Sequence, residues 1–184
     1  MTSLNDIIKV RLESLQEAAE ELIADDTAMS KLRDEHPESY RESVHATSLA
    51  THIQGIFTGI ESTLIEILKK IDGKVPTGES SHRDVLIEAS TANMKRPPIL
   101  SEGTHKTITE LLGFRHVVRK NYGMHLKPSR VFENRACALT AVAELHTDID
   151  AFFAALQSHA ETPINAPTHG DGPSDEAADG APKP

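Results

Sequence analysis

The sequence predicts an all-α protein, an up-and-down bundle of four main helices with one extra short helix. Only 4% of the 184 residues are aromatic and tryptophan is absent, whereas the helix-favouring residues Ala, Leu, Ile, Glu and Lys are abundant. Apolar residues recur at helical spacing in several segments. No segment has the alternation of apolar and polar residues that is typical of a strand.

The first half of the chain predicts two long helices. The first should begin at Ser3 or Asn5, either of which can cap it, and the stretch DDTAMSKLRDEHP that follows is interpreted as a short helix or turn. The second should run from Pro37 to Asp72 and stop at Gly73. Its apolar face is wide and continuous, which is typical of the central helix of a bundle. The apolar positions of the two helices are Ile8, Leu12, Leu15, Ala19 and Leu22, then Leu49, Ile53, Ile56, Phe57, Ile60, Leu64, Ile67, Leu68 and Ile71.

The second half predicts a short helix and two longer ones. The short helix should span about residues 82–93 and lead into KRPPILS, which is extended because a residue before proline avoids the α region. The next helix is expected to be capped by Ser101 and to end at Gly123. Ser129 should cap the last helix, which reaches about Ser158 and turns these residues inward: Val131, Leu139, Val142, Leu145, Ile149, Phe152, Phe153 and Leu156.

We expect one helical domain over residues 1–159 and a disordered acidic tail over residues 160–184. The stretch from Glu161 to Pro184 holds five of the ten prolines and three of the ten glycines, and has five acidic residues against Lys183. Such a stretch buries too little apolar area to offset its ordering entropy.

Charge and cysteine content limit the possible functions. A net charge of −9 argues against non-specific coating of nucleic acid, although one local basic pocket is compatible with it, and we expect no DNA partner. The single cysteine, Cys137, fits a reducing compartment and is interpreted as a buried core residue. No apolar run is long enough to span a membrane. We therefore expect a soluble, cytoplasmic protein without membrane contact.

Two arginines interrupt the apolar face of the helix over residues 102–123. At roughly 100° per residue, Arg115 falls in the middle of this face and Arg119 follows one turn later. Burying an unpaired guanidinium costs several kcal/mol. The arginines can extend into water, pair with an internal carboxylate such as Glu61, or line a cleft where they bind phosphate. In such a cleft a neighbouring His or Lys can move a proton, and Tyr122 can stack or hydrogen-bond.

The segment FRHVVRKNY, residues 114–122, resembles the signature of HEPN-domain proteins, specifically the HepT-like branch of prokaryotic toxins. Further segments resemble motifs of this family in the same order along the chain: IFTGIE (56–61), SHRDVL (81–86), RPPILS (96–101) and LKPSRV (126–131). Together they cover about residues 40–132. The resemblance implies a HEPN-like helical bundle.

The resemblance also implies an activity. Active members of the family are metal-independent endoribonucleases that need no cofactor and work as homodimers, with Arg and His from each subunit in a shared cleft. The ribose 2′-OH attacks the adjacent phosphorus, an arginine stabilises the developing charge, and a histidine exchanges the proton. By position, Arg115 is the motif arginine, His116 its polar neighbour and Tyr122 the motif tyrosine, while Arg119 would hold the RNA backbone.

The resemblance further implies a partner. In such toxin–antitoxin pairs a small nucleotidyltransferase-type antitoxin silences the toxin, in some cases by attaching AMP to the motif tyrosine, here Tyr122. His82 lies at a family position and either lines the same cleft, where it would contact substrate, or caps its helix.

This chain differs from the family at one motif position. Lys120 stands where the catalytic histidine is expected, five residues after Arg115. A lysine titrates far above neutrality, so it is a poor general base unless it is desolvated. The proton-transfer role stays open between His116 and Lys120. The alternative function is a non-catalytic HEPN module that binds RNA, a nucleotide or a partner protein.

Three Glu-x-x-His strings invite comparison with di-iron bundles, whose metal ligands have this spacing. They begin at Glu42, Glu79 and Glu102. Glu79 falls in a loop and Glu102 points away from the apolar face of its helix. We therefore expect no metal site.

Overall fold

The computed structural model describes residues 2–78, 80–120 and 126–161. Helices make up nearly all of this part of the chain, and the only β-type pairing in it is an isolated bridge between Asn93 and Arg96. The predicted all-α class is therefore confirmed. The predicted tail lies outside the described residues, apart from the end of the last helix. In chain order the helices are α1 (Leu4–Glu35), α2 (Glu42–Ile71), α3 (Ser81–Ser90), α4 (Glu102–Lys120) and α5 (Pro128–Glu161).

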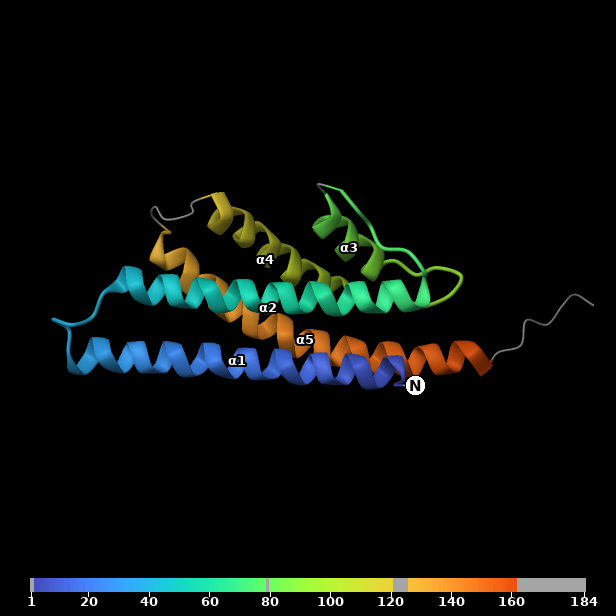
Figure 1. The fold of residues 1–184 in the computed structure, drawn as a ribbon, viewed down its shortest axis with the longest axis horizontal. Helices are drawn as coiled ribbons and strands as arrows, with labels where there is room; N and C mark the ends of the chain where they lie inside the picture. The colour runs from blue at the N-terminus through green and yellow to red at the C-terminus, as the bar shows by residue number, and fades with distance from the viewer. Residues whose placement is uncertain (1, 79, 121–125, 162–184) are drawn as a thin grey trace, which may run out of the picture.

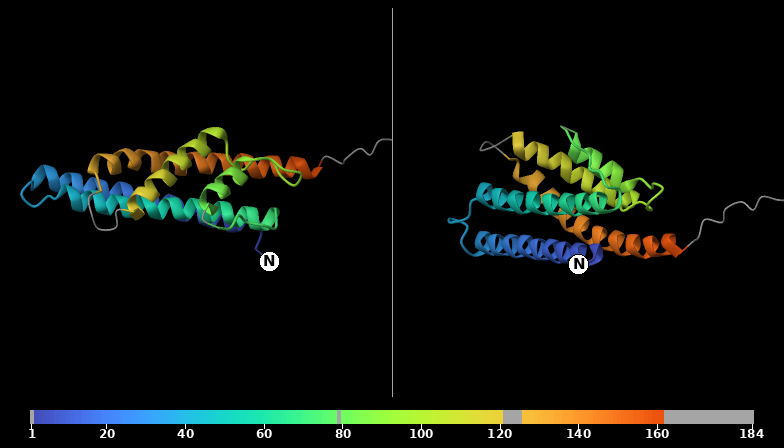
Figure 2. Two further views of the ribbon diagram at one scale, coloured as in Figure 1. Left: turned by 90° about the horizontal axis from the view of Figure 1, so that it is seen from above. Right: turned by 45° about the vertical axis from the view of Figure 1, so that its right-hand side comes forward.

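Helix α2 is the centre of the bundle and packs against each of the other four helices. In Figures 1 and 2, α1 and α4 lie on opposite sides of it, and α5 packs along both α1 and α4. All nine apolar positions predicted for this helix face inward, and only Ile71, at its end, keeps appreciable exposure. Because this apolar face is wide, several helices can bury their own apolar residues against α2 at once, and together they form the core.

Two helix boundaries in the first half differ from the prediction. Ser3 caps α1 through a capping box with Asp6, as its sequence position indicates. However, α1 continues through the segment interpreted as a separate short helix or turn and ends at Glu35, because that segment contains no glycine or proline before Pro37. Helix α2 begins at Glu42 rather than at Pro37, after a turn.

The second half shows smaller shifts. Helix α3 ends at Ser90, and Pro128 rather than Ser129 opens α5, since proline suits the first helical position. Ser101 precedes α4, and its hydroxyl accepts a hydrogen bond from the Thr104 amide at 3.3 Å, as expected of its cap. Gly123, the predicted end of this helix, lies outside the described residues.

Gly59 lets α1 approach α2 closely. A Cβ atom placed at Gly59 would lie 2.7 Å from Leu15 Cδ2, whereas one at Gly55, a turn earlier, would meet nothing within 4 Å. Both glycines lie within the same helix, where glycine costs about 1 kcal/mol relative to alanine. The two positions therefore differ mainly in the space beside them: α1 lies against Gly59 but not against Gly55.

A buried ion pair joins the end of α2 to the segment that leads into α4. The Arg96 side chain is 1% exposed, and its guanidinium donates to both carboxylate oxygens of Asp72 at 2.8–3.1 Å. It also donates to the carbonyl oxygens of Glu88, Thr91 and Pro97. One side chain thus connects the last turns of α2 and α3 with the extended RPP segment.

The same pair makes stability depend on acid pH. Burial alone would raise the pKa of Asp72, but the hydrogen bonds from Arg96 and Asn93 outweigh it and hold this pKa below its ordinary value of 3.8. The stabilisation by the ionised carboxylate is therefore present above pH 3.8 and is lost as the pH falls through the lowered pKa.

No helix in the described part of the chain is long and apolar enough to cross a lipid bilayer.

The substitution Arg96→Met should lower the free energy of unfolding by about 3–5 kcal/mol, because it leaves the buried Asp72 carboxylate without its partner. Urea denaturation followed by circular dichroism measures this change. Arg130→Met is the control, since Arg130 pairs with Glu133 on the surface and its side chain is 73% exposed. It should cost less than about 1 kcal/mol. Equal losses for the two variants would contradict the structural role of Arg96.

Gly55→Ala should raise the free energy of unfolding by about 0.5–1 kcal/mol, because alanine favours the helix and the site has room for a methyl group. Gly59→Ala gains the same propensity but pushes against Leu15, so we expect it to be less stable than Gly55→Ala by about 1–3 kcal/mol. Thermal and urea unfolding of the matched pair test this. Identical stabilities would show that α1 is not held close by Gly59.

Candidate functional site

Arg115 lies on the side of α4 that faces α2. Its side chain is half-buried, and its guanidinium carbon lies 5.6 Å from the centre of the Phe57 ring. Phe57 is itself fully buried in α2. A guanidinium over an aromatic face is attracted by the ring quadrupole, and this contact fixes the side chain without using its hydrogen-bond donors.

The guanidinium of Arg115 is not neutralised by a carboxylate among the described residues. Its Nη1 atom is buried and has no hydrogen-bond partner there. A buried donor without an acceptor costs about 1–3 kcal/mol. Arg115 as a whole is only half-buried, so an incoming anion can approach the exposed part of its side chain. The interpretation that Arg115 pairs with Glu61 is therefore wrong.

Glu61 has a different partner, His82. Glu61 follows Phe57 by one turn of α2 and is only 8% exposed. Its Oε1 atom forms a short hydrogen bond with Nδ1 of His82, in the first turn of α3. The Glu61 carboxylate, which was the expected partner of the arginines, is thus bound to His82. Rather than capping its helix through its side chain, His82 contacts α2.

The other predicted residues of α4 lie on its surface. In Figure 1, α4 diverges from α2 toward its C-terminal end, and Arg119 and His116 there are both exposed. Arg119 extends into solvent, one of the outcomes expected for these arginines. Lys120 is the last residue of α4, but its side chain and the whole of Tyr122 lie outside the described residues. The structure therefore brings Arg115 together with Phe57, but does not bring His116 to that contact.

Positive charge is concentrated in one segment of the chain. Residues 115–135 contain six lysines and arginines against one glutamate, although the whole chain has a net charge of −9. The last turns of α4 and the first turns of α5, which hold most of these residues, lie at the same end of the bundle (Figures 1 and 2). Two of the cations are paired, Arg130 with Glu133 and Arg135 with Asp26 of α1, so an anionic ligand would be attracted by the others, which include Arg115 and Arg119.

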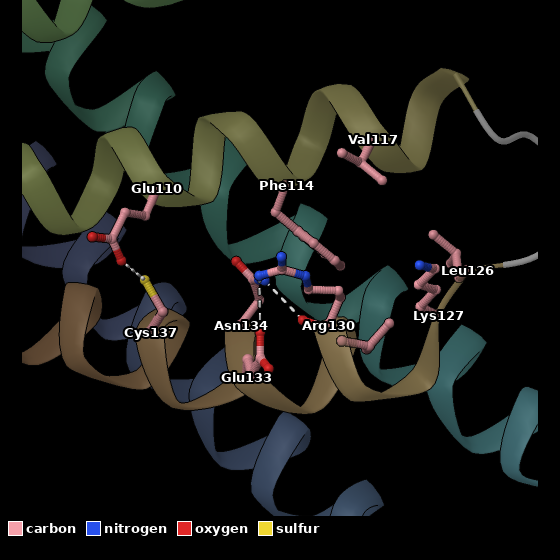
Figure 3. Close-up of a pocket in the computed structure, with 10 residues that line it drawn as sticks. Glu110, Phe114, Val117, Leu126, Lys127, Arg130, Glu133, Asn134 and Cys137 are labelled. Carbon is pink, nitrogen blue, oxygen red and sulfur yellow. Dashed lines mark hydrogen bonds and ion pairs between the residues drawn. The ribbon is translucent and has the colours of Figure 1, made fainter.

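A separate cavity of about 620 Å³ lies between α4 and α5 (Figure 3). Its apolar wall includes Phe114, Leu126 and Val131, and Lys127 and Arg130 also line it. Of the predicted site residues whose side chains the structure describes, none lines this cavity. It opens along the α5-facing edge of α4, whereas Arg115 contacts α2.

Cys137 contributes to the wall of that cavity. Its thiol donates a weak hydrogen bond to the Thr107 carbonyl at 3.4 Å. Burial, followed by the charges of Glu110 and Glu144, raises the pKa of the thiol to about 11. At neutral pH the thiol stays protonated and is a poor nucleophile. Cys137 is half-buried and packs against the core from the cavity wall, so its interpretation as a buried core residue is wrong.

The histidines of two Glu-x-x-His strings have other partners. His45 is buried, and its two ring nitrogens lie 3.0 Å from Asp26 Oδ1 and 3.2 Å from the Tyr40 hydroxyl. His82 is bound to Glu61, and Glu79 lies outside the described residues. Within the described ranges no three His, Cys, Asp or Glu side chains are grouped so that they could hold a metal ion.

Phe57 was not among the residues predicted for the site, because it belongs to the core stripe of α2 and has the burial of a core residue. Two signals were available: Phe57 and Glu61 both lie in the IFTGIE segment that resembles a family motif, and they are four residues apart, so they occupy successive turns of one helix face. That face receives Arg115 from α4 and His82 from α3.

The chain was compared with protein families, curated proteins and solved structures. The model of a family described as HepT-like protein matches residues 48–156. No curated protein and no solved structure matches the chain significantly. The matched range is more than half of the sequence and contains all five segments whose motifs resemble the family, together with α3 and α4. The chain therefore belongs to the HepT-like family of HEPN-domain proteins.

Proposed function

We propose that this protein is the toxin of a toxin–antitoxin pair, and that it cleaves RNA without a metal ion. The observation that supports this most directly is the guanidinium of Arg115, which is held on the Phe57 ring and has an unpaired donor. An arginine placed in this way can bind the non-bridging oxygens of a phosphodiester. The local excess of positive charge at the same end of the bundle favours an RNA backbone as ligand.

In the proposed reaction the ribose 2′-oxygen attacks the adjacent phosphorus. Its P–O bond forms while the bond from phosphorus to the 5′-oxygen of the next nucleotide breaks, which leaves a 2′,3′-cyclic phosphate and a 5′-hydroxyl. Arg115 stabilises the negative charge that develops on the phosphorane oxygens. Arg119, one turn further and exposed, holds the backbone of the strand, with Tyr122 and His82 as further contacts to RNA.

The proposed active unit is a homodimer in which the C-terminal parts of both α4 helices border one cleft. Arg115 and Arg119 from two copies would then face a single strand. A nucleotidyltransferase-type antitoxin is the proposed partner, and Tyr122 is the residue that it would modify with AMP. In the cleft the proton is transferred by His116 or Lys120, the two ionisable neighbours of the arginines in the motif.

A non-catalytic binding module is the second candidate, and Lys120 in place of the motif histidine favours it. Such a module would use the same basic end to hold RNA, a nucleotide or a partner protein. An RNase assay with EDTA present separates the two functions. Cleavage that survives chelation supports the toxin, and RNA binding without cleavage supports the module.

Arg115→Ala should lower RNA cleavage by about 100-fold or more and should abolish growth arrest when the protein is expressed, because one charge-stabilising donor of the transition state is lost. Helicity should persist, since no carboxylate among the described residues loses its partner. Arg33→Ala, which removes an exposed arginine near the end of α1, is the control and should leave cleavage unchanged. An Arg115→Ala variant as active as the parent would rule out the proposed cleft.

A further inference from the structure

The proton-transfer group proposed so far has weak geometric support. His116 is exposed and projects about 100° away from Arg115 around α4, so the two side chains do not converge. Lysine is a poor base at neutral pH, which limits Lys120. A histidine that lies on the Phe57 side of α4 would suit the reaction better.

We infer that His82 is the general base of the proposed RNA cleavage and that Glu61 is its positioning residue. The inference rests on the proposed function and assigns the proton-transfer step, which the family motif would place at position 120, to another helix. Three features support it: His82 and Arg115 contact neighbouring turns of α2, His82 Nδ1 is hydrogen-bonded to Glu61, and Nε2 of the ring has no hydrogen-bond partner among the described residues.

His82 and Arg115 meet neighbouring turns of α2. Arg115 lies over the ring of Phe57, and His82 is bound to Glu61, four residues later. One turn separates these positions by roughly 6 Å along the helix axis. Helix α3 also packs directly against α4. We infer that a phosphate on the guanidinium and a ribose hydroxyl near the imidazole can belong to one nucleotide.

The hydrogen bond to Glu61 fixes the role of each ring nitrogen. An ionised carboxylate can only accept a hydrogen bond, so Nδ1 must donate its N–H to Glu61, and the neutral ring is held as the Nδ1–H tautomer with a lone pair on Nε2. This is the arrangement in which a carboxylate orients a catalytic imidazole and stabilises the imidazolium that forms. Glu61 forms no ion pair with Lys or Arg among the described residues, so its charge is directed at His82.

The second nitrogen remains available. The His82 side chain is 27% exposed, and no hydrogen bond to Nε2 is found in the described part of the chain. In the reaction Nε2 accepts the proton of the 2′-OH as the oxygen–phosphorus bond forms. The 5′-oxygen leaves with its electron pair and takes a proton from water, and the hydroxide so formed takes the proton from the His82 imidazolium, which restores the water and the neutral ring.

His82→Asn is the decisive variant, because the asparagine amide can still donate to Glu61 from the position of Nδ1 but has no counterpart of Nε2. We expect kcat for a short RNA to fall by about 100-fold or more, and KM and the affinity for RNA, to which His82 is one contact among several, to change far less. Glu61→Gln keeps an acceptor but removes the charge, and should give a smaller loss, also in kcat. Circular dichroism of each variant reports whether it folds, and NMR of the parent reports the tautomer of His82.

His52→Gln is the matched control. His52 lies near the Asp25 carboxylate on the α1 side of α2, and its side chain is 28% exposed, almost as much as that of His82. It should cleave RNA like the parent.

The outcomes distinguish the inference from the proposed function. If the parent cleaves RNA and folded His82→Asn cleaves it equally fast, His82 is not the base, but the nuclease function stands. The same conclusion follows if NMR shows the Nε2–H tautomer. If the parent binds RNA without cleaving it, the nuclease function itself is wrong and the assignment of His82 is wrong with it.

Discussion

The burial of most of the circumference of α2 determines both the fold and the site. A helix that packs against four others must be apolar around most of its circumference, and each polar group on it needs a specific partner. Phe57 and Glu61 satisfy this requirement in different ways on successive turns. Phe57 offers a ring face that a guanidinium can cover, and Glu61 accepts a hydrogen bond from an imidazole. Two separate helices are thereby directed to one stretch of α2.

The pairing of charges within this site decides whether Arg115 can bind an anion. If Glu61 had paired with Arg115, the guanidinium would have been neutralised and the site would have been part of a structural core. The structure pairs the carboxylate with His82 instead and leaves Arg115 on an uncharged ring. The acidic character of the whole chain therefore coexists with a basic end at α4 and α5, where an anion can be bound.

Helical periodicity in the sequence was sufficient to predict most of the core, including the central position of α2. Helix ends were harder, because residues 25–35 mix good helix formers with Asp, Thr and Ser, and only Pro37 marks a clear stop. Arg115 could be assigned to the inner face of α4 by angle alone. The partner of Glu61 could not be predicted, since the choice between Arg115 and His82 depends on where α3 packs. That position depends on contacts between residues far apart in the chain, such as the one between Arg96 and Asp72.

Helix α3 has only ten residues, too few for a helix that is stable by itself. Arg96 fixes its C-terminal end by binding the Glu88 and Thr91 carbonyl oxygens, and the hydrogen bond from His82 to Glu61 fixes its N-terminal end. Both anchors tie it to α2, one at Asp72 and the other at Glu61. Changes in the connection between Gly73 and Ser80 can therefore be absorbed without rotating α3, so this loop can vary in length among related proteins while the imidazole keeps its orientation.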